Sequence, residues 1–104
     1  MNIEFLYFEG CPSAERLLPR VRALLERAGV RDEPQLRLVE SIEDAERERF
    51  LGSPSLRLDG RDIEPGADAR TDFGLKCRLY QTASGTAGTP PDAWVLAAIG
   101  AAQR

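Results

Sequence analysis

The sequence predicts a single α/β domain whose strands and helices follow one another in the order β-α-β-α-β-β-α. Two observations carry this prediction. An apolar run near the N-terminus passes directly into an amphipathic helix pattern, and the dipeptide Asp59-Gly60 marks a tight hairpin between two later strands. A chain of 104 residues is long enough for one core and too short for a second domain. We therefore treat residues 1–104 as one domain.

The first part of the chain predicts a strand, a helix and a second strand. Residues 3–8 are apolar with little alternation, which is typical of a strand buried on both faces. Residues 12–28 place their apolar side chains on one helical stripe, with Gly29 as the C-cap and Pro19 as an interior residue that should kink the axis. Residues 36–40 form the next strand, which should run parallel to the first because a crossover helix connects them.

The middle of the chain predicts a short helix and a hairpin. Ser41 and Asp44 form an approximate capping box for a charged helix over residues 43–50. Strands at residues 56–58 and around residues 62–63 are joined across Asp59-Gly60, since both central residues of this turn type need positive φ.

Residues 64–91 are too long for an ordinary connection and contain several glycines and prolines. We expect an irregular insertion or lid, in which residues 75–80 are apolar enough to form an added strand or a packed cover. A final helix begins at Pro90-Pro91-Asp92 and should dock on the sheet. Its apolar stripe is Trp94, Val95, Ala98 and Ile99.

Composition excludes several classes of function. The net charge of −3 and the pI near 5.0 argue against a nucleic-acid surface. Histidine is absent, which excludes Cys-His proteolysis, Ser-His-Asp hydrolysis and zinc sites containing histidine. No signal peptide and no membrane-spanning stretch is recognisable, so we expect a cytoplasmic protein without membrane or nucleic-acid partners.

Cys11 is the most informative residue, because it stands where the first strand passes into the first helix. A thiol at a helix N-terminus is favoured as the thiolate by the helix dipole and by unpaired N–H groups. Gly10 should let the backbone approach a partner closely, and Pro12 suits the first helical turn. Ala14 stands where a Cys-x-x-Cys motif would have its second cysteine, so the only other thiol is that of Cys77.

Cys11 at the helix start, Pro19 eight residues later and Ser53-Pro54 before the third strand together resemble the thioredoxin fold, over about residues 1–64. The sequence Cys11-Pro12-Ser13-Ala14 is similar to a glutaredoxin site reduced to one thiol. The chain thus resembles small bacterial thioredoxin-like proteins. The resemblance implies a three-layer thioredoxin-like sandwich, with a long insertion before the C-terminal helix.

The resemblance also implies roles for individual residues. Pro54 should follow a cis peptide bond, and the N–H and C=O of Ser53 should pair with an extended peptide or with the backbone of glutathione. Ser13 should either support the thiolate of Cys11 or cap the helix. Glutathione is implied as a co-substrate, and no tightly bound cofactor is expected.

The sequence therefore predicts a thiol–disulfide oxidoreductase in which Cys11 forms mixed disulfides with a protein or with glutathione. Cys77 is either a packed residue of an accessory strand or a distal resolving thiol. Two alternatives remain: a protein that binds a soft metal or metalloid through Cys11 and Cys77, and a binding module without catalysis, which the exposed edge of the hairpin would suit. Either a monomer or a homodimer is compatible with the sequence.

Overall fold

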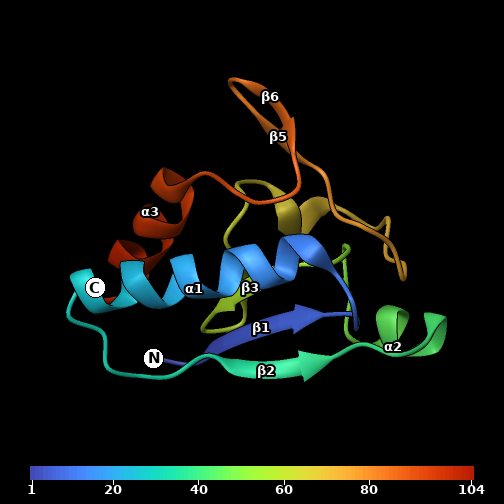
Figure 1. The fold of residues 1–104 in the computed structure, drawn as a ribbon, viewed down its shortest axis with the longest axis horizontal. Coiled ribbons are helices and arrows are strands. Elements are labelled where there is room, and N and C mark those ends of the chain that lie inside the picture. Colours follow the sequence, from blue (N-terminus) through green and yellow to red (C-terminus); the bar gives the residue numbers. More distant parts are fainter.

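A computed structural model describes all residues from Met1 to Arg104. Three helices and a four-stranded mixed sheet form the body of the molecule, and a two-stranded hairpin extends from it (Figure 1). The predicted mixed α/β class is therefore confirmed. In chain order the elements are β1 (Ile3–Tyr7), α1 (Pro12–Arg27), β2 (Gln35–Leu38), α2 (Ile42–Arg47), β3 (Ser55–Leu58), β4 (Arg61–Asp62), the 3₁₀ turn η1 (Ala67–Ala69), β5 (Tyr80–Thr82), β6 (Gly85–Ala87) and α3 (Asp92–Ala102).

Strand β1 lies inside the sheet, whose strand order is β2-β1-β3-β4. It pairs in parallel with β2 and antiparallel with β3. Strands β3 and β4 form an antiparallel hairpin, and the connecting residues Asp59 and Gly60 both have positive φ, at 52° and 82°. The parallel pairing of the first two strands and the position of the hairpin turn were both predicted correctly.

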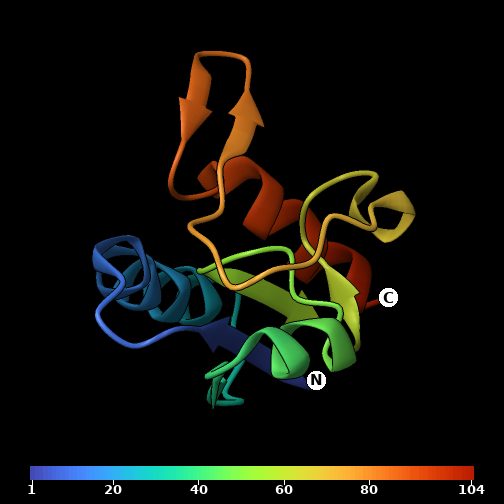
Figure 2. The same cartoon turned by 90° about the vertical axis from the view of Figure 1, so that its right-hand side faces the viewer.

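The sheet is covered on both faces (Figure 2). Phe5 packs in the larger core under α1 and α3, whereas its neighbour Leu6 packs with Phe50 and Ala45 of the α2 region on the opposite face. The strand is therefore apolar without alternation because both of its faces are buried. The fully buried members of the larger core include Ile3, Phe5, Leu17, Val21, Leu56, Tyr80, Val95 and Ile99.

Helix α3 is fastened to α1 by polar contacts at its start. Arg20 of α1 donates hydrogen bonds to the Oγ1 of Thr89 and to the carbonyl oxygen of Pro90, and it pairs with the carboxylate of Asp92. Val95 and Ile99 then bury the inner face of α3, as their spacing predicts. No helix combines the length and the apolar character needed to cross a lipid bilayer.

Residues 64–91 are more ordered than the sequence predicts. They contain η1 and the hairpin of β5 and β6, and the side chains of Arg78 and Tyr80 are fully buried. Residues 75–80 do not add a strand to the sheet. They pair with the body of the molecule like a strand at one point alone, an isolated bridge between Cys77 and Ser53.

Candidate thiol site

Cys11 is the N-cap residue of α1, with extended backbone angles, and Pro12 is the first helical residue. The carbonyl oxygen of Cys11 accepts the first hydrogen bond of the helix, from the N–H of Glu15 at 3.2 Å. Its side chain makes no capping hydrogen bond. The predicted placement of this thiol is confirmed, and it is the placement in which helix N–H groups and the helix dipole favour a thiolate.

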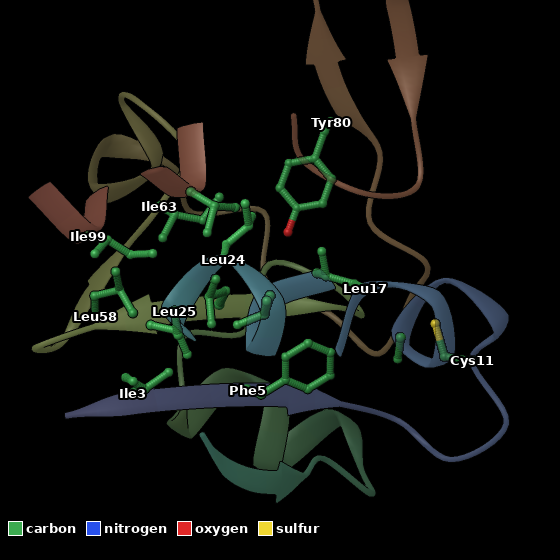
Figure 3. Packing of buried hydrophobic residues seen from close by; sticks show 14 residues of the cluster. Ile3, Phe5, Cys11, Leu17, Leu24, Leu25, Leu58, Ile63, Tyr80 and Ile99 are labelled. Atoms are coloured by element: carbon green, nitrogen blue, oxygen red, sulfur yellow. The ribbon is translucent and has the colours of Figure 1, made fainter. Parts of the chain in front are cut away.

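The thiol of Cys11 is closed off from solvent, since only 3% of the residue is exposed. Figure 3 shows Cys11 at one end of the core cluster that also contains Leu17 and Tyr80. Reactivity of a cysteine depends on access as well as on thiolate character. In this conformation Cys11 stands where a reactive thiol is expected, but a second molecule has no access to its sulfur.

The residues beside Cys11 do less than the sequence suggests. Ser13 does not cap the helix, because Cys11 holds that position and the Oγ of Ser13 accepts a hydrogen bond from Arg16. Gly10 adopts a φ of +81°, and a side chain there would meet no atom within 4 Å. This left-handed backbone conformation by itself favours glycine at this position.

The connection between β6 and α3 passes close to Ser13 in the first turn of α1. A Cβ atom added at Gly88 would lie 2.5 Å from the Oγ of Ser13. The same connection continues to Thr89 and Pro90, which are bonded to Arg20. Ser13 is thus partly covered by the chain itself.

The peptide bond between Ser53 and Pro54 is cis, as predicted. The Oγ of Ser53 accepts a hydrogen bond from the N–H of Phe8 at 3.2 Å. This bond ties the start of β3 to the loop that leads from β1 to Cys11. The structure therefore brings together the two chain segments that the sequence places at one site.

The backbone of Ser53 is not free to receive a ligand, which corrects the expectation from the sequence. Its N–H donates to the carbonyl oxygen of Lys76 at 2.8 Å, and its C=O accepts from the N–H of Arg78 at 2.9 Å. Both groups that would pair with an extended peptide or glutathione are occupied by the chain's own residues. The physical reason is strand addition within one molecule: an unpaired edge is satisfied by the nearest extended segment.

Cys77 lies between those two hydrogen bonds and is exposed to solvent. The interpretation of Cys77 as a packed residue of an accessory strand is therefore wrong. Its backbone is held against Ser53, while its thiol remains accessible.

The contacts that hold residues 76–80 in place were not predicted from the sequence. The buried guanidinium of Arg78 binds both carboxylate oxygens of Asp62, at 2.7 and 2.8 Å, and one of Glu64 at 3.2 Å. It also donates to the Oγ of Ser55. Burial lowers the pKa of the Arg78 guanidinium, but the hydrogen bonds to Asp62, together with the charge interactions with Tyr80, Asp62 and Glu64, leave that pKa above its usual range.

Tyr80 provides the second anchor. Its hydroxyl donates a 2.6 Å hydrogen bond to the carbonyl oxygen of Pro54, and its ring lies 4.4 Å from the guanidinium carbon of Arg78. Burial raises the pKa of the Tyr80 hydroxyl well above its usual range. One signal was available in the sequence: Lys76, Arg78 and Tyr80 alternate with Leu75, Cys77 and Leu79, which is typical of an extended segment with two different faces.

No group of three or more histidine, cysteine, aspartate or glutamate side chains is placed to hold a metal ion. Comparisons with protein-family models, with curated proteins and with solved structures give no match for this chain. Function is therefore inferred from the geometry around Cys11 and Ser53.

Proposed function

We propose that this protein is a thioredoxin-like thiol–disulfide oxidoreductase of the monothiol, glutaredoxin-like kind, with Cys11 as the nucleophile. The observation that carries the proposal is the placement of Cys11 at the N-cap of α1, three residues after Phe8, whose N–H is bonded to Ser53. A helix N-terminus favours the thiolate, and the thiolate is the form that attacks disulfides.

The arrangement of the elements supports a thioredoxin-like reading. A parallel β1-α1-β2 unit is followed by α2, by the antiparallel hairpin of β3 and β4, and by α3. Pro19 lies inside α1, and the cis bond before Pro54 precedes β3. The cis bond lies at the end of the sheet that leads to Cys11, since Ser53 is bonded to Phe8.

The proposed reaction requires a local opening, because Cys11 is buried and the backbone of Ser53 is occupied. In the open state the thiolate of Cys11 attacks one sulfur of a disulfide. A mixed disulfide forms, and the other sulfur leaves as a thiol. A small disulfide such as oxidised glutathione is the substrate class that suits this site, because it needs less of the covering segment to move than an extended protein segment does.

The test is the rate at which Cys11 reacts in the folded protein. In the variant Cys77→Ser, Cys11 is the only thiol, and its modification by oxidised glutathione is followed by mass spectrometry. We expect a single adduct on Cys11, formed faster than global unfolding allows. Modification only at the rate set by global unfolding would contradict the proposal. The variant Cys11→Ser is the control for modification at Cys77.

The two alternatives give different results in the same variants. A soft-metal protein would bind mercury or copper(I) through Cys11 and Cys77 together, so each single serine variant would lose the 1:1 complex. A binding module without catalysis would show no thiol exchange at all in the folded state. No observation in the structure favours either alternative over thiol exchange.

A further inference from the structure

The edge at Ser53 is occupied by a segment that carries a thiol. The hydrogen bonds of Ser53 to Lys76 and Arg78 place Cys77 directly beside Ser53. Adjacent extended segments lie about 4.8 Å apart, which fixes the separation between the backbones of Cys77 and Ser53. A thiol-bearing residue thus already lies at the edge where a substrate would pair.

This placement is enforced by buried contacts on the inner side of the segment. Arg78 is bound to Asp62 and Glu64, and the hydroxyl of Tyr80 is bound to Pro54. Gly52 has a φ of +124°, and a Cβ atom there would lie 2.9 Å from the Cβ of Arg78. The segment is therefore packed against the residue before Ser53 too closely for any side chain at that position.

The outer side of the segment faces the loop that leads to Cys11. Directly paired residues carry their side chains on the same face, and the Oγ of Ser53 is bonded to the N–H of Phe8. Leu75, two residues before Cys77, lines a pocket of about 410 Å³ together with Phe8 and Glu9. Both observations put the outer side of the segment near the β1–α1 loop, which ends at Cys11.

We propose that Cys77 is the internal partner of Cys11, and that the two form a reversible intramolecular disulfide across Ser53. This inference rests on the proposed function and names the second thiol of that site. A disulfide requires Cα atoms within about 7 Å, so the proposal requires the two segments to come within that distance of each other. The monothiol site would thus operate as a dithiol site whose second cysteine comes from residues 64–91.

The proposed function sets the order of the steps. In the open state the thiolate of Cys11 attacks a small disulfide and forms a mixed disulfide, releasing one thiol. The thiolate of Cys77, which is exposed, then attacks the sulfur of Cys11 and releases the second thiol. The two cysteines lose two electrons and two protons together, and the small disulfide becomes two thiols. A dithiol reductant reverses the reaction.

The experiment treats the folded protein with oxidised glutathione, counts free thiols, and maps disulfides by peptide mass spectrometry. In the wild-type chain we expect the number of free thiols to fall from two to zero, with no retained glutathione and a Cys11–Cys77 cross-linked peptide in the monomer. Cys77→Ser and Cys11→Ser should each retain one glutathione instead. As a matched control, the double variant Cys77→Ser/Leu79→Cys moves the thiol to the next outward position, away from the pairing with Ser53, and should not form the cross-link.

The outcomes separate this inference from the proposed function. If Cys77→Ser takes up glutathione on Cys11 while the wild-type chain forms no internal bond, the inference is overturned and the proposed function stands. Dimers linked through Cys77, or equal cross-linking in the Leu79→Cys control, also overturn the inference. If Cys11 reacts in none of these proteins while folded, both proposals fail.

Discussion

Strand β1 and residues 75–80 are both buried in part, but they bury opposite kinds of side chain. In β1, apolar residues fill both faces of the sheet, and Glu4 is the one buried charge. In the later segment Arg78 and Tyr80 point inward, whereas Leu75 and Leu79 are 40% and 61% exposed. The first region is held by burial of apolar area, and the second by a few directional contacts between charged and polar groups. A substitution that removes a single contact should therefore destabilise residues 75–80 more selectively than β1.

The largest expected effect is that of Arg78→Met. This change leaves Asp62 largely buried without its cation and removes one of the two cations that bind Glu64, which should lower the free energy of unfolding by about 3–5 kcal/mol. Arg70→Met is the matched control, because Arg70 also binds Glu64 but is 30% exposed and should lose no more than about 1 kcal/mol. Urea denaturation measures the free energy of unfolding of both variants. Equal losses would show that the burial of Arg78 is not what stabilises residues 75–80.

Gly52→Ala comes next. Its φ of +124° disfavours a side chain, and the added Cβ would meet Arg78 at 2.9 Å, so we expect a loss of about 2 kcal/mol. The backbone amide of Ser53 should exchange its hydrogen faster, because the pairing with Lys76 is disturbed. Gly60→Ala provides the comparison, since φ there is +82° with no atom within 4 Å, and it should cost about 1 kcal/mol without changing that exchange rate.

Tyr80→Phe should lower the free energy of unfolding by about 1–2 kcal/mol at neutral pH, because the carbonyl oxygen of Pro54 loses its buried donor. Tyr7→Phe serves as the control. Tyr7 lies against the same core without a hydrogen bond from its hydroxyl, and it should change stability by less than about 0.5 kcal/mol. Similar losses in the two variants would mean that the bond to Pro54 does not hold the segment.

The same tyrosine predicts a loss of stability in alkali. Burial raises the pKa of Tyr80 in the folded state above the unfolded value of about 10, so the folded state keeps a proton that the unfolded state releases. The stabilisation is complete below about pH 10 and declines as the pH rises further. Between about pH 8 and about pH 11 the urea midpoint should fall in the wild type, and it should fall by less in Tyr80→Phe. An unchanged difference would contradict this assignment.

The smallest expected effect on stability is that of Cys77→Ser, at less than about 0.5 kcal/mol, because this thiol is exposed. The reactivity of the two thiols should nevertheless differ clearly. Under native conditions iodoacetamide should modify Cys77 more than about tenfold faster than buried Cys11. Comparable rates would show that Cys11 is not closed off in solution.

The sequence was a good guide where apolar spacing determines burial, as in β1, α1 and the hairpin at Asp59-Gly60. It also located Cys11 and the cis bond before Pro54. It could not predict the pairing of Ser53 with Cys77, because hydrogen bonds between backbones carry no side-chain signature. The partners Arg78 and Asp62 are 16 residues apart, and a buried charge inside an apolar stretch is not visible in periodicity. Contacts between segments that are distant in the sequence therefore determine how the thiol site is covered.

The hairpin of β5 and β6 projects from the body of the molecule, and both of its ends are tied down (Figures 1 and 2). Arg78 and Tyr80 secure the chain before it, and the contacts of Arg20 with Pro90 and Asp92 secure the chain after it. A protease that cuts at the exposed tip, Ala83-Ser84, should therefore leave two fragments that stay associated and folded. The same position should accept an inserted peptide tag or new chain termini, so residues 1–83 and 84–104 could be produced separately and reassembled.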